Sequence, residues 1–182
     1  MANALEYHLR REGGEKSAFD IIVASGARAS FPHAKASDKI IRKGEIVMID
    51  WGVVYRGYNA DLTRTVIIGP PTHRQKRVLG IIQKAQATAI QKVKAGVKCK
   101  LVDQAARKVV EKSGYKKYFG HGLGHGIGLK VHEYPKISVD SQDVLKAGMV
   151  ITLEPGVYIP GWGGVRIEDM ILVTKRGCKI LT

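Results

Sequence analysis

The sequence predicts a single α+β domain that spans residues 1–182. Segments with strand character occupy the first and last parts of the chain, and two helical segments lie between them, an order that is typical of α+β folds. Apolar residues make up 45% of the chain, which is enough for one sizeable core. No internal repeat, low-complexity tract or Pro/Ser-rich linker indicates a second domain.

The first segment predicts one helix, one strand and a long loop. Ala2–Arg11 has the pattern of a helix that Gly13-Gly14 stops. Residues 21–24, Ile-Ile-Val-Ala, form an apolar strand. We expect the chain to continue from there as a loop through Pro32-His33.

A β-hairpin that carries two acidic residues is predicted next. Two runs with strand character, Glu45–Tyr55 and Tyr58–Ile68, are joined by a turn near Arg56-Gly57. Asp50 and Asp61 lie on the two arms, and the midpoint between them falls within about one residue of this turn. We therefore expect the two carboxylates to face each other across the hairpin.

Two helices follow the hairpin. Thr72 begins the first, because its Thr-x-x-Gln spacing to Gln75 is that of a capping box. Apolar residues then recur at helical spacing until Gly96, namely Val78, Ile82, Ala85, Ala89 and Val93. The second helix is expected over Leu101–Ser113, with Gly114 at its end.

The last third, from His121 on, is rich in glycine and predicts a second hairpin with two acids. Strands are expected at Met149–Leu153 and Val165–Thr174. The midpoint between Glu154 and Glu168 is the centre of a turn at residues 160–164. These two carboxylates should therefore also meet across their hairpin.

Four acids that face a core need positive charge close by, because a buried carboxylate without compensation is costly. The strands that carry them offer only Arg64 and Arg166. Any one of the acids alone could be a surface residue or a salt-bridged core residue. Two divalent cations would balance the four together, and oxygen-rich ligation favours manganese, cobalt or iron over tetrahedral zinc.

An imidazole ligand is expected from the segment 121–133, His-Gly-Leu-Gly-His-Gly-Ile-Gly-Leu-Lys-Val-His-Glu. Alternate glycines add no side-chain packing, so they indicate close backbone approach or unusual torsions beside a pocket. Three histidines within 12 residues, His121, His125 and His132, strengthen the prediction of a metal site.

Five motifs spread over nearly the whole chain resemble those of the pita-bread metallopeptidases, a family that includes methionine aminopeptidase, aminopeptidase P and prolidase. Besides the Gly-His segment above, they are Ile49-Asp50-Trp51-Gly52, Asn59-Ala60-Asp61-Leu62-Thr63-Arg64-Thr65, Leu153-Glu154-Pro155-Gly156 and Gly164-Val165-Arg166-Ile167-Glu168-Asp169. The resemblance implies a creatinase/aminopeptidase-like fold, in which helices flank a curved antiparallel sheet.

The same resemblance implies five metal ligands for two divalent ions: Asp50, Asp61, His125, Glu154 and Glu168. Asp61 and Glu168 would bridge the ions. Manganese is the first expectation, with cobalt, iron or zinc as alternatives. Such a dinuclear site would lower the pKa of a bridging water, so that hydroxide is available near neutral pH.

The hypothesis for catalysis assigns the general base and acid to Glu154. His121 and His132 would flank the substrate, one of them stabilising the developing oxyanion. His33 would support the leaving proline. Arg166 would either hold the metal-binding acids in place or bind the substrate carboxylate, and the sequence leaves both roles open.

The expected reaction is hydrolysis of Xaa-Pro bonds in dipeptides or short peptides. Pro32-His33, Thr63-Arg64 and Arg166 are similar to the proline-specific branch rather than to methionine aminopeptidase, and the Gly-His segment resembles prolidase more than aminopeptidase P. Two alternatives remain open, namely methionine aminopeptidase and a non-catalytic pita-bread module that binds a protein or a nucleic acid.

Composition bears on partners and compartment. The net charge is +14, but Lys and Arg concentrate in residues 73–117, where they alternate with apolar residues as on a solvated helical face, so nucleic-acid binding is disfavoured. No stretch reaches the roughly 18 apolar residues that a membrane span needs. Cys99 and Cys178 lack a partner motif, and they suit reduced thiols in the cytoplasm.

The amino-terminal end departs from the family pattern. Full-length proline-specific members carry a separate amino-terminal domain and a further helix before the one matched by Ala2–Arg11. A catalytic domain truncated in this way should expose apolar surface, which predicts self-association, as a dimer, or partner binding.

Overall fold

The computed structural model describes all residues from Met1 to Thr182. Along the chain, the helices and strands are α1 (Ala2–Arg11), β1 (Lys16–Ser17), β2 (Ile22–Ser25), a 3₁₀ turn (Gly26–Ser30), β3 (Ile46–Trp51), β4 (Val53–Tyr55), β5 (Tyr58–Asn59), β6 (Leu62–Ile67), α2 (His73–Ile90), α3 (Cys99–Lys112), a second 3₁₀ turn (Lys116–Tyr118), β7 (Gly124–Gly126), β8 (Glu133–Ile137), β9 (Val150–Leu153), β10 (Gly156–Ile159), β11 (Gly163–Arg166), β12 (Asp169–Val173) and β13 (Cys178–Ile180). The α+β class predicted from the sequence is confirmed.

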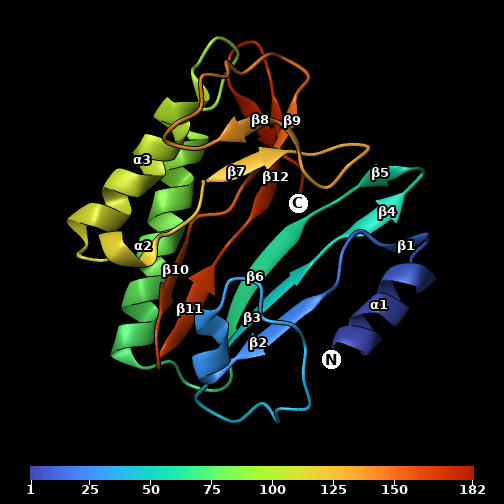
Figure 1. Cartoon of the computed structure of the whole chain (residues 1–182), viewed down its shortest axis with the longest axis vertical. Helices are drawn as coiled ribbons and strands as arrows, with labels where there is room; N and C mark the ends of the chain where they lie inside the picture. Colours follow the sequence, from blue (N-terminus) through green and yellow to red (C-terminus); the bar gives the residue numbers. More distant parts are fainter.

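All strand pairs are antiparallel. The largest sheet has five strands in the order β13-β12-β9-β7-β8, and β2-β3-β6 and β1-β4-β5 form sheets of three strands each. β10 and β11 pair separately as a hairpin. Figure 1 shows α2 and α3 packed side by side along one flank, with α1 on the other side of the molecule.

The main core lies between the helices α2 and α3 and the strands beside them. It contains 20 buried residues, among them Val78 and Ile82 of α2, Val102 of α3 and Ile151 of β9. A smaller cluster of five buried residues is formed by side chains of β2, β3 and the first 3₁₀ turn together with Tyr158 of β10. The predicted helical stripes therefore face the core.

The capping box predicted for α2 is present, because the Thr72 hydroxyl accepts from Gln75 N–H and the Gln75 side chain pairs with Thr72 N–H. The prediction that this helix continues to Gly96 is wrong, since α2 ends at Ile90. The N–H groups of Ala95 and Gly96 donate instead to the carbonyls of Thr174 and Leu145. These tertiary hydrogen bonds replace the helical ones.

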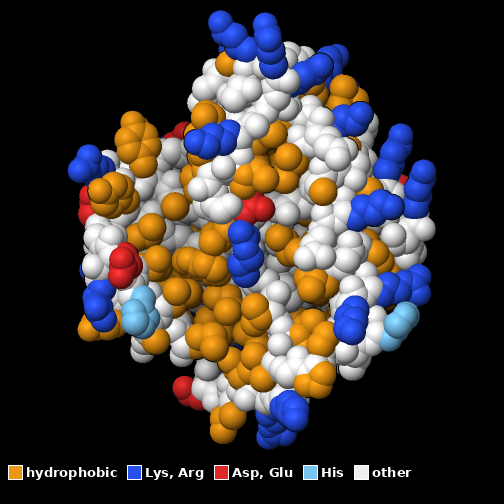
Figure 2. Space-filling view, turned by 180° about the vertical axis from the view of Figure 1, so that it is seen from behind, with side chains coloured by type: hydrophobic (Ala, Val, Ile, Leu, Met, Phe, Trp, Pro, Cys, Tyr) orange, Lys and Arg blue, Asp and Glu red, His pale blue; other side chains and the backbone are white.

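Apolar surface is exposed away from the main core. α1 buries none of its residues, and Ile49, Trp51, Leu62 and Val66 of β3 and β6 are only half-buried or exposed. Figure 2 shows a broad apolar area on the back of the molecule. The expectation that a truncated domain exposes apolar surface and self-associates stays a prediction.

No helix combines the length and apolar character that crossing a membrane requires. Cys99 and Cys178 are both free thiols, as the sequence predicted.

Candidate metal centre

The four predicted acids lie where the two long hairpins are interrupted. Asp50 is near the end of β3, and Asp61 lies between β5 and β6. Glu154 follows β9 directly, and Glu168 directly precedes β12. The continuous strands predicted around Asp50, Asp61 and Glu168 are therefore broken in the structure at or near each acid, whereas the strand predicted before Glu154 ends at Leu153 as expected.

The predicted pairing of Asp50 with Asp61 is wrong by two positions. Asp50 is opposite Thr63 in the β3–β6 register. The turn that joins the arms places both Arg56 and Gly57 at positive φ, and its centre lies one residue later than the midpoint between the acids. Asp50 and Asp61 are therefore diagonal neighbours, and both line one cavity.

The predicted meeting of Glu154 and Glu168 agrees with the register of their hairpin. Leu153 pairs with Asp169 on one side of the interruption, and Gly156 pairs with Arg166 on the other. Both pairs belong to the same register, and in that register Glu154 lies opposite Glu168. The two acids consequently face each other across the break.

One atom each from Asp61, His125 and Glu168 lies within 4.8 Å of the others, which is a spacing suited to a shared metal ion. His125 Nε2 is 3.7 Å from Asp61 Oδ2 and 3.6 Å from Glu154 Oε1. Four of the five expected ligands thus converge directly. The fifth, Asp50, lines the same cavity, with Oδ2 held by Arg166.

His125 is suited to bind a cation through Nε2. Its Nδ1 lies 3.0 Å from the carbonyl oxygen of Gly126, so Nδ1 carries the hydrogen and Nε2 has a free lone pair. Burial lowers the pKa of His125 to about 4, so the ring is neutral at pH 7. At 3.7 and 3.6 Å the oxygens of Asp61 and Glu154 are too far from Nε2 for a hydrogen bond, whereas a metal ion between them would satisfy all three groups.

Fully ionised, the four acids would carry more negative charge than nearby side chains balance. Burial, together with repulsion from Glu168 and Asp50, raises the pKa of Asp61 to about 9, and burial and Asp50 raise that of Glu168 to about 7. Burial also raises the pKa values of Asp50 and Glu154. Arg166 is the one buried cation in contact with any of the four acids.

Two buried oxygens of this cluster, Asp50 Oδ1 and Glu168 Oε1, have no hydrogen-bond partner. A buried acceptor left unpaired is unfavourable unless an ion satisfies it. Arg64, the other cation on these strands, does not fill this role, because its guanidinium pairs with Asp169 Oδ1 at 2.7 Å. The donor set therefore fits divalent cations that prefer oxygen.

Arg166 ties the acids to the rest of the cleft. Its Nη2 donates to Asp50 Oδ2, and its Nε donates to the hydroxyl of Thr63, which itself donates to Glu168 Oε2 at 2.7 Å. Its Nη1 donates to the Tyr158 hydroxyl and to the carbonyl oxygen of Pro32. Four of the five N–H groups of a guanidinium are thus engaged within the protein.

Tyr158 and Thr63 are two residues of the site that the sequence argument missed. The Tyr158 hydroxyl accepts from Arg166 and lies 3.0 Å from His121 Nε2. His121 Nδ1 lies 2.7 Å from the carbonyl oxygen of Gly122, so the ring donates there and its Nε2 accepts from Tyr158. Residues separated by an even number of positions along a strand point to the same face. Thr63 lies two positions after Asp61 and Tyr158 four positions after Glu154, so strand alternation could have identified both residues.

The cleft consists of two adjoining cavities of about 350 and 790 Å³. His33, His125, His132, Glu154 and Arg166 line both of them. His121 lines only the larger one. The rings of His132 and His125 are 4.3 Å apart between centroids, so the exposed His132 stands at the edge of the metal-binding cluster.

The Gly-His segment is held in place from α3 and the neighbouring strands. The fully buried Asp103 accepts from Leu123 N–H and pairs with Arg107, which donates to the carbonyl oxygen of His121. A Cβ on Gly124 would lie 2.0 Å from Thr152 O, and one on Gly126 would lie 2.2 Å from Tyr134 O. Close backbone approach therefore explains these two glycines, as the sequence predicted.

The chain matches metallopeptidase family M24 over residues 1–175. It is 50% identical over all 182 residues to a Xaa-Pro dipeptidase of Pyrococcus horikoshii, and it covers 52% of that relative. The chain therefore spans about half the length of the curated relatives that it matches.

Solved structures agree with this match. The prolidase of Pyrococcus furiosus superposes with a TM-score of 0.97 at 49% identity, over 98% of this chain and 53% of that one. An X-Pro aminopeptidase of Thermotoga maritima superposes with a TM-score of 0.96 at 48% identity, over 98% of this chain and 51% of that one. The pita-bread fold expected from the motifs is thereby confirmed.

Proposed function

This chain belongs to metallopeptidase family M24, and from that premise we propose that it provides the catalytic site of a metal-dependent peptidase for Xaa-Pro bonds in dipeptides or short peptides. The observation that carries the proposal is the convergence of Asp61, Glu154 and Glu168 on the neutral imidazole of His125, with Asp50 in the same cavity and paired with Arg166. The names of the similar dipeptidases, prolidases and X-Pro aminopeptidases support the substrate class.

Five residues are proposed to hold two divalent ions, with manganese preferred: Asp50, Asp61, His125, Glu154 and Glu168. The unpartnered oxygens of Asp50 and Glu168 and the free Nε2 of His125 support this assignment. When bound, such ions would lower the pKa of a water between them and polarise the scissile carbonyl. Cobalt, iron and zinc are the alternatives to be tested.

Glu154 is proposed as the group that accepts and returns a proton. It is only partly buried, it lines both cavities, and the pKa of its carboxyl is raised by burial and by Glu168. A raised pKa brings a carboxyl closer to the range in which it can exchange a proton near neutral pH. His125 is proposed only as a ligand, because its free nitrogen faces the acids.

The remaining residues of the cleft are proposed to position the substrate. His132 and His33 are exposed at the cavity walls, where each can donate a hydrogen bond to a peptide. His121 is held neutral, because burial lowers its pKa to about 4. For Arg166, the hydrogen bonds support holding the acids in place rather than binding a substrate carboxylate, since its donors already have partners.

The test measures metal content and turnover on the same sample. The chain is stripped with a chelator, reloaded with manganese or cobalt, and assayed on Xaa-Pro dipeptides, longer Xaa-Pro peptides and Met-Ala peptides. About two ions per chain with Xaa-Pro cleavage is the expected result. Cleavage of Met-Ala peptides alone would overturn the substrate assignment in favour of methionine aminopeptidase.

Variants distinguish loss of the metal site from loss of the fold. Asp61→Asn should lose metal and turnover together while it keeps the circular dichroism spectrum. The matched control is Asp38→Asn, which alters an exposed acid outside the cleft. Full metal content and turnover in Asp61→Asn would overturn the ligand assignment, and an intact chain that binds no metal would indicate a non-catalytic interaction module.

The cytoplasmic compartment and the homodimer remain proposals. Two free thiols support a reducing compartment, and the exposed apolar area supports self-association. Sedimentation of the full chain over a concentration series would test the dimer.

A further inference from the structure

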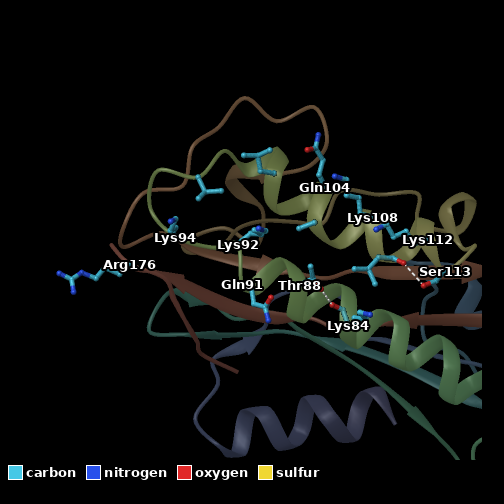
Figure 3. Close-up of a pocket in the computed structure, with 14 residues that line it drawn as sticks. Lys84, Thr88, Gln91, Lys92, Lys94, Gln104, Lys108, Lys112, Ser113 and Arg176 are labelled. Carbon is cyan, nitrogen blue, oxygen red and sulfur yellow. Dashed lines mark hydrogen bonds between the residues drawn. The ribbon is translucent and has the colours of Figure 1, made fainter.

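A basic groove lies between α2 and α3, outside the cleft. Its volume is about 930 Å³. Six cationic side chains line it, and no acidic residue does: Lys84, Lys92, Lys94, Lys108, Lys112 and Arg176. Figure 3 shows that these side chains come from both helices, from the segment after α2 and from the turn before β13. None of the residues that line the groove lines the two cavities of the cleft.

The positive charge of the molecule is concentrated on this layer. Residues 73–117 contain 13 Lys or Arg but only two acids, Asp103 and Glu111, and so account for +11 of the net charge of +14. Asp103 is buried and paired with Arg107, and Glu111 pairs with Lys116. Neither acid neutralises the groove, and none of its six cations forms an ion pair. Catalysis in the cleft does not explain this charge.

The groove also has an aliphatic component. Val97, Leu101, Ala105 and Val109 line it, and the Leu101 side chain is 48% exposed. No aromatic residue is present. Lysines on both walls therefore flank an aliphatic strip. Apolar side chains of a ligand could pack on this strip, while acidic side chains of the same ligand pair with the lysines.

We propose that this groove docks an acidic amphipathic segment of a partner protein. Charge complementarity supplies the attraction, and the aliphatic strip selects a segment that also carries apolar residues. From Leu101 to Lys112 the α3 wall is about 16 Å long, at about 1.5 Å per residue, which matches a partner helix of about three turns. Single-stranded nucleic acid fits less well, because its bases bind by stacking on aromatic side chains, and the groove has none.

The test measures binding of a fluorescent probe peptide to the full chain. The peptide has about 12 residues, with Glu and Leu arranged at helical amphipathic spacing. Binding is followed by fluorescence anisotropy at about 50 mM and about 300 mM salt. Two peptides serve as comparisons: one of the same composition in scrambled order, and one with Ser in place of Leu. A single-stranded RNA oligonucleotide is the nucleic-acid arm. We expect the amphipathic probe to bind at least about tenfold more tightly than either comparison peptide, and more weakly at high salt.

The groove variant combines Lys84→Glu with Lys108→Glu, one from each wall. The matched control combines Lys16→Glu with Lys179→Glu, two exposed lysines outside the groove, and changes the net charge equally. The groove variant should weaken probe binding at least about tenfold and the control less than about twofold. Leu101→Ser should weaken the amphipathic probe but not the Ser-containing peptide.

Two results would overturn the proposal. Equal weakening by the groove and control variants would mean that binding depends on net charge alone. Tighter binding of the RNA, with competition against the probe and the same sensitivity to the groove variant, would assign the groove to nucleic acid. Melting curves of each variant establish that the substitutions leave the fold intact.

Discussion

Raising the pH of the metal-free protein from about 7 to about 8.5 should lower its free energy of unfolding. Asp61 has a pKa of about 9 in the folded protein, whereas an Asp carboxyl in an unfolded chain titrates near about 3.9. In this window the folded state holds a proton that the unfolded state has already released. Stability therefore falls as the pH rises towards the folded-state pKa.

The size of this loss in the free energy of unfolding follows from the single proton on Asp61. Each proton bound only by the folded state changes stability by about 1.4 kcal/mol per pH unit, so Asp61 accounts for a loss of about 2 kcal/mol across the window. Below about pH 6.5 the effect is masked, because His121 and His125 have pKa values lowered to about 4 and change stability in the opposite sense. Above pH 7 both histidines are neutral in the folded and unfolded states.

The assay is urea unfolding with chelator present, followed by circular dichroism at several pH values. Wild type should lose about 2 kcal/mol more than Asp61→Asn, and Asp38→Asn should behave as wild type. Saturating manganese should remove the loss, because carboxylates that bind metal have released their protons. An equal pH dependence in wild type and Asp61→Asn would refute the reasoning, as would a manganese-loaded protein with the metal-free slope.

Three further predictions concern the support of the site. Arg166→Met should destabilise the metal-free protein by about 3–5 kcal/mol in urea unfolding, because it leaves a buried carboxylate unpaired; a loss below about 1 kcal/mol would contradict the buried network. Tyr158→Phe should cost about 1.5–3 kcal/mol, since it removes the acceptor for a charged donor, and an unchanged unfolding midpoint would argue against that hydrogen bond. Gly126→Ala should lower the melting temperature sharply, because its Cβ would lie 2.2 Å from Tyr134 O, whereas Gly177→Ala has open space and should change little.

The sequence was most informative where local chemistry decides structure. The Thr72-Gln75 spacing located the start of α2 correctly, and the apolar stripe located α3 within two residues of its observed ends. Inward acids within apolar runs indicated a candidate cation site from the sequence alone, and the structure brings these acids close together. The end of α2 was misplaced, because the bonds of Ala95 and Gly96 to distant carbonyls are invisible in a local pattern.

Cross-strand geometry was harder to predict. A shift of one residue in the centre of the Arg56-Gly57 turn moves the partner of Asp50 from Asp61 to Thr63. The hydroxyl of Tyr158 was missed because its partners, Arg166 and His121, come from separate segments. Strand alternation places such a side chain on a face of the sheet, but it does not identify the partners from other segments, whereas a cap or a helical stripe is defined within one segment.

The interruptions in the hairpins explain how acids on separate strands converge. Pro155 has no N–H to donate to the partner strand, so the ladder is weakened directly after Glu154, where only the Pro155 carbonyl accepts, from Ile167 N–H. Backbone bonds beside these breaks reach other segments: Glu154 N–H donates to Leu123 O of the Gly-His segment, in continuation of the β7–β9 register, and Glu168 N–H donates to Thr63 O of the first hairpin. Each of these two acids is thus fixed by a segment other than its own hairpin partner. The backbone bonds of Glu154 and Glu168 therefore join the second hairpin to the histidine segment and to the first hairpin, and so bring the acids of both hairpins into one site.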